Sequence, residues 1–509
     1  MKINIIYAGN FSKYEDHKYD YSSRIYSRGR FNDSIMPLVL PTLAALTPSD
    51  FDITLTNENN VNVEAVEFDP TFDLVAISFL TLGSSRAYAI ADRFRDIGVY
   101  VVMGGIHVSK LPDEAGRHAD TIFIGEAEET WPKFIEDFLN GNPKTVYQCE
   151  SFPDLQKPVM PRWDLLDSEY PVKYVQTTRG CPFKCEFCST NSFSGKPRHK
   201  PVEHVIEEIK EIMRISGSNI IHFADDNLIG NRRYAKALFQ ALIPLKINWW
   251  GAVSMNIAKE DELMELARQS GCFAVLIGIE SVNQESLDGV NKGKQNKTDE
   301  FIRNINKIQT NGFFVVALMM VGFDEDDNTI FKQTMDFLEE ANIFLAAFSM
   351  ITPLPGTPLF KRLEDADRLL YDDWDMYDYR NVCFEPKRMS KEELRNGFIE
   401  LIETFYSFEN LSQRWNRAWE LYDFNQSFNP MIVNEDKVQL SKKYYTDLLK
   451  NEQDIIEPDD FMRPYLRWTI DEIWKKDFSA MTIISYVLSQ AFHYHSIIEA
   501  HRRQDSLYV

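Results

Sequence analysis

Short apolar runs alternate with segments of helical periodicity over the first 140 residues. The runs are KINIIYA, DITLTNE, DLVAISFL, VYVVMGG and TIFIGE. Between the third and fourth runs, Tyr88, Ala91, Phe94 and Ile97 repeat at helical spacing. Continuous β-rich runs separated by helices are typical of a parallel sheet covered on both faces. The pattern predicts a doubly wound, Rossmann-like α/β domain over residues 1–140.

Proline is dense after this domain, between residues 141 and 172. Because proline removes a backbone donor and fixes φ, such a stretch is typical of a connector rather than of a helix or strand. We therefore expect a proline-rich linker over 141–172. Its prolines are Pro143, Pro153, Pro158, Pro161 and Pro171.

A second strand–helix series follows over residues 173–365. Its apolar runs are KYVQTTR, NIIHFADD, NWWGAVS, CFAVLIGIE, FFVVALMMVGF and LAAFSMITPLP. Helical segments such as VEHVIEEIKEIMRI separate them. The series predicts a partial (β/α)6 barrel, whose active site should collect at the carboxyl ends of its strands.

The remainder, residues 366–509, shows helical periodicity in KEELRNGFIELIETFYSF and SAMTIISYVLSQAFHYHSIIEAHRR. We expect a mostly helical C-terminal domain that caps the barrel or holds substrate. Its aromatic residues are interpreted as core rather than as the lining of a substrate chamber. They include Trp415, Trp419, Tyr422, Trp468 and Trp474.

Composition and charge narrow the classes of partner. The net charge is −22, which argues against a nucleic acid as main partner, because phosphates require a basic surface. No apolar run reaches the roughly 18 residues of a membrane span, and the N-terminal run lacks the features of a signal peptide. Six cysteines in 509 residues form no disulfide framework, so we expect a cytoplasmic protein.

Three of the six cysteines lie within GCPFKCEFCS, at Cys181, Cys185 and Cys188. A disulfide would leave a third thiol over. A structural zinc site usually takes four protein ligands, and no second cysteine pair follows. A triplet that stops at three suits a [4Fe–4S] cluster with one iron open to a small molecule.

The spacing Cys-x-x-x-Cys-x-x-Cys after the strand KYVQTTRG resembles the signature of the radical S-adenosylmethionine (SAM) enzymes, including Phe187 before the last cysteine. The resemblance implies that SAM chelates the open iron and that one electron from the cluster yields a 5′-deoxyadenosyl radical. It also implies SAM contacts near the strand ends. The SAM-binding residues expected on this basis are Phe187, Asp225, Asp226, Ser254, Glu280 and Val321.

The string GGIHVSKLPDEAGRHADTIFIGEAEETW and the segment PLVLPTLAALTP resemble the cobalamin-binding front domain of one class of these enzymes. One departure is clear: the Asp-x-His-x-x-Gly loop of cobalamin mutases is absent after the first strand, where Gly9 and Asn10 stand instead. His17 lacks that context and is interpreted as a surface residue. The resemblance therefore implies cobalt without a histidine ligand.

The cobalamin tail should pass the carboxyl ends of three front-domain strands. Glycine matters there because a bare backbone admits a bulky corrin, so a valine at Gly105 is expected to block the corrinoid. His107 is interpreted as a loop hydrogen-bonder rather than a metal ligand. The expected cobalamin-binding residues are Ser78, Phe79, Leu80, Thr81, Gly104, Gly105, Ile106, Gly125 and Glu126.

The resemblance favours a cobalamin-dependent radical methylase. One SAM would methylate the corrinoid, and a second would supply the radical that abstracts hydrogen from an unactivated carbon, which then takes the methyl group from methylcobalamin. The alternative is a ring-forming or C–C bond-forming radical enzyme whose front domain is degenerate or uses cobalamin differently. A third hypothesis is a non-catalytic electron-transfer protein, but such a carrier needs no open iron.

A methylase of this kind needs an electron donor such as flavodoxin or ferredoxin. Its substrate would be a small molecule, natural product or lipid. Lipid, tetrapyrrole, peptide and antibiotic precursor all stay open at this point.

Overall fold

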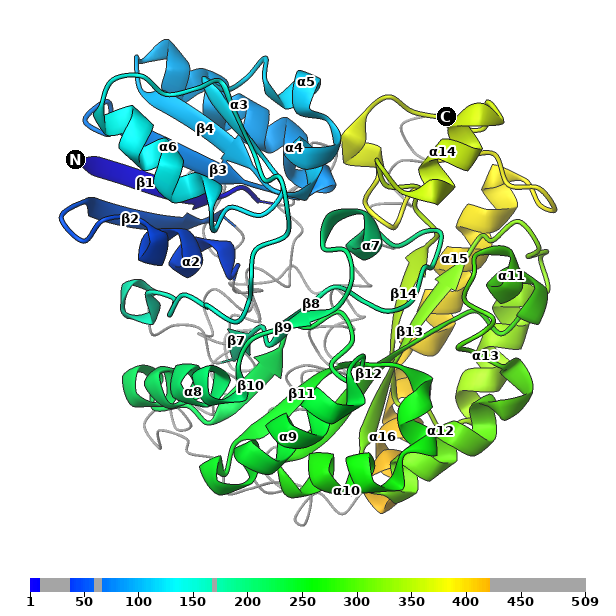
Figure 1. Cartoon of the computed structure of the whole chain (residues 1–509). Coiled ribbons are helices and arrows are strands. Elements are labelled where there is room, and N and C mark those ends of the chain that lie inside the picture. The colour runs from blue at the N-terminus through cyan, green and yellow to red at the C-terminus, as the bar shows by residue number, and fades with distance from the viewer. Residues whose placement is uncertain (10–36, 59–65, 167–171, 422–509) are drawn as a thin grey trace, which may run out of the picture.

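The computed structural model describes residues 1–9, 37–58, 66–166 and 172–421. Figure 1 shows two α/β units side by side, with the front domain in blue and cyan and the larger unit mainly in green. No helix in the described ranges is long and apolar enough to cross a membrane.

The front domain is built on a six-stranded, fully parallel sheet of order β2-β1-β3-β4-β5-β6. All five predicted strands are present, and the order reverses between β1 and β3. In open α/β sheets, ligands bind outside the carboxyl ends of the strands at such a point. The strands are β1 (Lys2–Tyr7), β2 (Asp52–Asn57), β3 (Leu74–Ser78), β4 (Tyr100–Gly104), β5 (Thr121–Ile124) and β6 (Val146–Gln148).

Helices cover both faces of this sheet, which confirms the doubly wound prediction. Along β1, Ile3 and Ile5 pack toward α2 (Val39–Leu46) and α6 (Thr130–Leu139). Ile6 points to the opposite core. That core includes α3 (Ser84–Asp96), α4 (Ile106–Lys110) and α5 (Pro112–Ala115), with η3 (Thr81–Gly83) leading into α3.

The proline-rich stretch is not purely a connector, so the expectation for 141–172 needs a correction. It contributes β6, which pairs with β5 at the sheet edge, and the 3-10 turn η4 (Trp163–Leu165). Only the middle residue of β6 is buried. A three-residue edge strand with one buried side chain leaves no periodic signal in the sequence.

The second unit is a six-stranded parallel sheet of order β14-β13-β12-β11-β10-β7, the strand order of a partial barrel. Every predicted strand is present. They are β7 (Lys173–Val175), β10 (Ile220–Phe223), β11 (Asn248–Val253), β12 (Cys272–Glu280), β13 (Phe314–Val321) and β14 (Leu345–Met350).

Helices follow these strands, and their apolar sides share one core with the sheet. The 3-10 turns η5 (Ile243–Leu245), η6 (Met255–Lys259) and η7 (Thr298–Glu300) lie between them. The helices are α8 (Val202–Ser216), α9 (Arg232–Leu242), α10 (Asp261–Gln269), α11 (Gln284–Gly289), α12 (Phe301–Thr310), α13 (Ile330–Glu340) and α14 (Pro358–Asp365).

Two short strands flank the cysteine segment; the first lies within the predicted run KYVQTTR, and the second was not predicted. β8 (Thr178–Arg179) and β9 (Arg198–His199) pair antiparallel, with α7 (Thr190–Phe193) between them. They join the start and the end of the segment that carries the three cysteines.

The described part of the C-terminal region is helical, with η8 (Trp374–Met376), α15 (Lys391–Phe405) and α16 (Phe408–Leu421). A capping box of Ser390 and Glu393 begins α15. Trp415 is fully buried and packs on Phe344, as expected for a core residue. Tyr422, Trp468, Trp474 and the segment SAMTIISYVLSQAFHYHSIIEAHRR lie outside the described residues.

Candidate active site

The cysteine loop starts at Gly180, directly after β8. Gly180 has φ +88°, and a Cβ there would lie 2.6 Å from the carbonyl oxygen of Gly195. Only glycine fits this position. Within the loop, the Cys188 amide donates to the Cys185 carbonyl oxygen (3.2 Å). A tight turn therefore brings the second and third cysteines together.

The three thiols form one electrostatic group. Burial raises the pKa of Cys185 to about 11, and the other two cysteines add to this effect. Burial also raises the pKa of Cys181. In the described ranges, no three His, Cys, Asp or Glu side chains converge closely enough to hold a single metal ion. In a multi-iron cluster each thiolate binds its own iron, and three neighbouring thiols supply the donors for this.

Asp225 and Asp226, just after β10, accept hydrogen bonds from residues on both sides of the three cysteines. The Asp225 carboxylate accepts hydrogen bonds from the amide and hydroxyl of Thr177 (3.1 and 2.8 Å) and of Thr178 (2.6 Å for the hydroxyl). Burial raises its pKa to about 6. Asp226 accepts from the Gly180 amide (3.0 Å) and the Thr190 hydroxyl (2.9 Å). The structure thus gives both carboxylates contacts within the loop, and SAM contacts for them stay a prediction.

Glu280 ends β12 in a conformation that few residues adopt. Its φ is +68°, and the strand register shifts between Gly278 and Glu280. Its carboxylate pairs with Lys292 (3.1 Å), and both side chains are largely buried. A Cβ at Gly278 would lie 2.3 Å from the Glu280 carboxylate and 3.2 Å from the Lys292 ammonium. The glycine therefore leaves room for this ion pair.

Lys292 connects the ion pair with the cysteines. Burial alone would lower its pKa, but the charges of Glu280, Cys185 and Cys181 outweigh burial, so the pKa lies above its usual value. Sequence reasoning missed Lys292. No sequence pattern marks Lys292 as a site residue, because it lies in a loop, 12 residues beyond the strand that carries Glu280.

The other expected SAM residues lie at the ends of neighbouring strands. Val321 is buried at the end of β13. Phe187 packs with an apolar cluster beyond β13 and stands edge-on to Phe323 (6.4 Å between ring centroids). The Ser254 amide, after β11, donates to the Asn227 side chain (3.3 Å). Their contacts with SAM stay a prediction.

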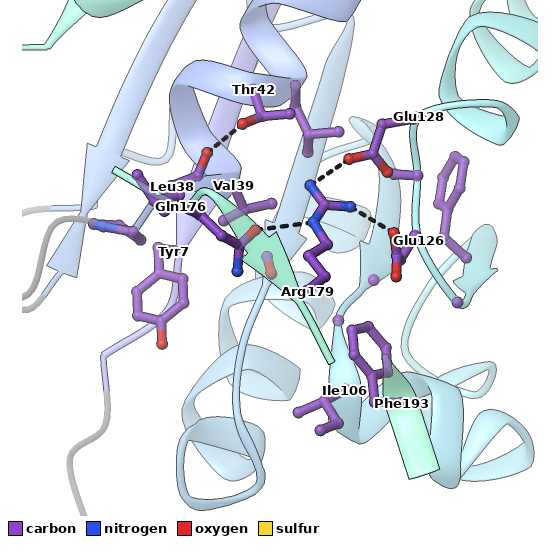
Figure 2. A pocket seen from close by; sticks show the side chains of 18 of the residues that line it. Tyr7, Leu38, Val39, Thr42, Ile106, Glu126, Glu128, Gln176, Arg179 and Phe193 are labelled. Carbon is purple, nitrogen blue, oxygen red and sulfur yellow. Dashed lines mark hydrogen bonds and ion pairs between the residues drawn. The ribbon is translucent and has the colours of Figure 1, made fainter. Parts of the chain in front are cut away.

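A cavity of about 550 Å³ lies between the carboxyl edge of the front sheet and the barrel (Figure 2). The front domain contributes one side of α2 and the ends of β1, β3, β4 and β5, and the barrel unit contributes residues on both sides of the cysteine loop. Eight of the nine expected cobalamin residues line it: Ser78, Phe79, Leu80, Gly104, Gly105, Ile106, Gly125 and Glu126.

Thr81, the ninth, is not among the lining residues. Its hydroxyl lies 3.2 Å from Nδ1 of His107, which agrees with a hydrogen-bonding role for that histidine, although His107 lies in α4 rather than in a loop. Gly105 needs a second correction. At φ +113°, its Cβ would lie 2.9 Å from the Phe79 carbonyl oxygen. A valine there would strain the sheet itself, so it is no clean test of corrinoid binding.

Arg179 joins the two units across this cavity. Its guanidinium pairs with Glu126 and Glu128 (both 2.5 Å) and also donates to Gln176 (2.9 Å), as Figure 2 shows. Arg198 makes a further ion pair with Glu126. Burial alone would raise the pKa of Glu128, but Arg179 outweighs it and holds the pKa below its usual range. Glu126, expected to contact cobalamin, is thus engaged by two arginines.

The residues present fit both implied groups. The thiols of Cys181, Cys185 and Cys188 are the donors that a [4Fe–4S] cluster takes, with the Lys292 cation beside them. Gly104 leaves the end of β4 open, because a Cβ there would meet only Phe123, at 3.4 Å. A bulky corrinoid needs such a bare edge next to a cavity.

Comparison with known proteins agrees with this geometry. The model of the radical SAM superfamily matches residues 175–338, and a domain of unknown function matches 357–505. Bacteriochlorophyllide d C-12(1)-methyltransferase of Chlorobaculum tepidum is 32% identical over 74% of this chain and 84% of that protein. The C-8(2)-methyltransferase of the same organism is 30% identical over 69% and 81%.

A solved structure has a similar fold. The radical SAM methyltransferase TsrM from Kitasatospora setae, determined with cobalamin and a [4Fe–4S] cluster, matches with a TM-score of 0.62 and 13% identity, over 99% of both chains. With the cysteine loop on a six-stranded partial barrel and a doubly wound domain in front, the chain belongs to the radical SAM superfamily, in the class that carries a cobalamin-binding-type front domain.

Proposed function

We propose that this enzyme transfers a methyl group to an unactivated carbon of its substrate, using a 5′-deoxyadenosyl radical and methylcobalamin. The observation that supports this most is the cavity shared by the two units. Gly104 lies on the front-domain side of it, and Asp226, which holds the cysteine loop, lies on the barrel side. A methyl donor and a radical source must both reach one carbon, and this arrangement brings their expected sites together.

When bound, the cluster supplies the electron that cleaves SAM, and the corrinoid supplies the methyl group. The residues of the chain hold and orient the reactants. Cys181, Cys185 and Cys188 hold the cluster. We assign the Lys292 ammonium to the SAM carboxylate and the Glu280 carboxylate to the ribose or the SAM ammonium, as charge-assisted hydrogen bonds.

We further propose a tetrapyrrole as the class of acceptor. Two relatives, at 32% and 30% identity, act, by name, on bacteriochlorophyllide d, and this chain covers more than four-fifths of each. A reduced flavodoxin or ferredoxin would deliver the electron.

A labelling experiment tests methyl transfer without knowledge of the acceptor. Protein loaded anaerobically with cluster and cobalamin is incubated with a low-potential reductant and SAM that carries a deuterated methyl group. We expect the label on the extracted corrinoid, together with an equal amount of S-adenosylhomocysteine. Formation of 5′-deoxyadenosine with no label on the corrinoid would contradict methyl transfer and favour the ring-forming or C–C bond-forming alternative.

The radical half of the reaction has its own control. Replacing Cys181, Cys185 and Cys188 with alanine should remove the iron–sulfur absorbance and all 5′-deoxyadenosine. Cys272→Ala changes a buried thiol on β12 that packs in the barrel core, and it should leave both signals in place.

A further inference from the structure

A buried ion pair of the barrel unit lies in the wall of the cavity between the two units. The Lys200 ammonium donates to the Glu208 carboxylate at 2.8 Å, and both residues line the cavity. Their side chains are only 11% and 1% exposed. Lys200 follows β9 and Glu208 lies in α8, so the pair belongs to one unit. Unlike the ion pairs of Arg179, it therefore has no part in joining the two units.

Backbone contacts fix the position of Lys200 near the cysteine loop. Its amide donates to the Thr177 carbonyl oxygen (2.9 Å), and the Thr177 hydroxyl donates to Asp225 (2.8 Å). The same carboxylate accepts from the hydroxyl of Thr178, the first residue of β8 (2.6 Å). Lys200 thus lies at the strand ends that carry the cysteine loop.

Both partners of this pair keep hydrogen-bonding capacity that the described residues do not use. An ammonium has three N–H donors, and among the described residues the Lys200 ammonium donates to Glu208 alone. The Glu208 carboxylate accepts from Lys200 alone in the same ranges, and Nε2 of His204 lies 4.0 Å away. Burial outweighs the charge of Lys200 and holds the pKa of Glu208 above its usual value. The carboxylate is therefore short of hydrogen-bond donors.

The chemistry of the pair indicates which group would complete it. Replacing a buried ion pair with apolar residues is often neutral or stabilising, so the pair is not explained by the stability of the fold. A ligand that offers one acceptor to Lys200 and one donor to Glu208 would satisfy both charges. A primary amide carries the two on neighbouring atoms, as a carbonyl oxygen and an N–H.

The two walls of the cavity differ in polarity. The front-domain wall is largely apolar or glycine, as at Leu38, Val39, Gly104, Gly105 and Ile106. The barrel wall is largely polar, as at Gln176, Ser189, Thr190, Ser194, Lys200 and Glu208. A corrinoid carries primary amides around the rim of its macrocycle. The barrel wall therefore provides the polar partners that these amides need.

We propose that Lys200 and Glu208 together bind one peripheral primary amide of the corrinoid. The Lys200 ammonium donates to the amide oxygen, and the amide N–H donates to the Glu208 carboxylate, so each charge gains the partner it lacks. The contact holds the corrinoid against the unit that carries the cysteine loop. This assignment rests on the proposed function only through the corrinoid, and it is independent of the acceptor substrate.

Equilibrium dialysis of cluster-loaded protein against cobalamin, without SAM or substrate, tests the assignment. The double variant Lys200→Met with Glu208→Leu removes both charges and leaves neither of them buried alone. We expect at least about tenfold weaker cobalamin binding, because hydrogen bonds to charged groups are lost, with unchanged iron and sulfide content. The matched control is Lys236→Met with Glu262→Leu. That pair is more exposed and links α9 to α10, so the affinity for cobalamin should not change.

Wild-type protein offers a second test that needs no variant. The isomeric monocarboxylic acids of cobalamin each have one peripheral amide hydrolysed to a carboxylate, which cannot donate to Glu208 and repels its charge. We expect one isomer to bind at least about tenfold more weakly than the others, since it loses a hydrogen bond to a charged group. The double variant should not distinguish the isomers.

Equal affinity of wild-type protein for all the isomers would overturn the proposal, even if the double variant did not fold. Unchanged cobalamin affinity in a folded double variant would overturn it as well. Wild-type protein would still bind cobalamin in both cases, and the labelling of the corrinoid described above reports on methyl transfer independently. The two proposals therefore fail separately.

Discussion

The ion pair of Glu280 and Lys292 places two charges in a largely buried site, at a cost in free energy of folding. Glu280 adopts a left-handed conformation, which costs on the order of 1–3 kcal/mol, and it is buried with Lys292 beside the cysteines. Removing one partner of a buried pair leaves the other charge uncompensated. Strain together with a buried ion pair at a strand end is typical of a binding site rather than of a stabilising contact.

Glu280→Gln keeps the shape of the side chain and removes its charge. We expect roughly 10- to 100-fold weaker SAM binding, since a hydrogen bond to a charged group contributes about 1.5–3 kcal/mol. The cluster should stay, because its three thiols are untouched. Anaerobic calorimetry with SAM measures the affinity, with the exposed Glu285→Gln on α11 as control. Equal affinity in Glu280→Gln and wild type would place Glu280 outside the SAM site.

His222 also predicts a pH dependence of stability. Its pKa is about 4 in the folded protein and 6.5 when unperturbed. As the pH falls below 6.5 the unfolded chain takes up a proton that the folded protein does not, so stability is lost between about pH 6.5 and 4. Acidification from pH 7 to 5 should cost wild-type protein about 2 kcal/mol more than His222→Phe. Urea unfolding at both pH values measures this, and an identical loss in both proteins would refute a neutral, buried His222.

At the scale of elements, the carboxyl ends of strands carry the chemistry of both units. In the front domain, the ends of β3, β4 and β5 line the cavity, and in the barrel the ends of β10 and β12 provide Asp226 and Glu280. Gly104 closes β4 with ordinary strand geometry, whereas Gly105 has a φ that only glycine adopts freely. The two adjacent glycines therefore have different roles. Gly105 allows the positive φ that the backbone requires there, and Gly104 leaves the cavity beside β4 open.

Gly104→Leu fills that space without backbone strain. A Cβ there meets only Phe123, at 3.4 Å, so the rest of the side chain enters the cavity. We expect loss of bound cobalamin with the cluster retained, measured as corrinoid and iron content after anaerobic reconstitution. Thr54→Leu adds similar bulk at an exposed position of the edge strand β2 and should retain both groups. Retention of cobalamin by Gly104→Leu would show that the corrinoid does not bind at the end of β4.

The elements were largely predictable from the sequence, and the contacts between them were not. Every run of five or more apolar, β-rich residues became a strand in the expected unit, because periodicity is a local property. β6, β8 and β9 have two or three residues each and owe their existence to pairing partners. Lys292 and His222 carry no motif. They matter because of neighbours on other strands, which one sequence does not display.

At the scale of the molecule, a buried ion network joins the front domain to the barrel. Arg179 lies directly before the cysteine loop and pairs with Glu126 and Glu128 of the front domain. Lys110 donates to the Ser192 carbonyl oxygen in α7 (2.5 Å), and Trp374 donates to Glu114 in α5 (3.1 Å). The cysteine loop is thus held against the front domain. We therefore expect a substitution on the front-domain side of this contact to alter the position of the cysteine loop.

Arg179→Leu removes the centre of this network. It leaves Glu128 without its ion-pair partner and Glu126 with Arg198 alone, so we expect a loss of about 3–5 kcal/mol, measured by urea unfolding. Limited proteolysis should then cut between the two units. Arg214→Leu breaks an exposed ion pair with Glu211 and should leave the stability nearly unchanged. Equal effects of the two variants would show that the network does not join the units.

Bound corrinoid in the wild-type protein tests the central claim most directly. The protein is purified and reconstituted without oxygen in the presence of iron, sulfide and cobalamin, freed of unbound cofactor, and analysed for iron, sulfide and corrinoid in one sample. The account predicts corrinoid in equimolar amount with the cluster, and its loss in Gly104→Leu. Folded wild-type protein with a full cluster and no corrinoid would contradict cobalamin-dependent methyl transfer, and would leave only the radical chemistry of Cys181, Cys185 and Cys188.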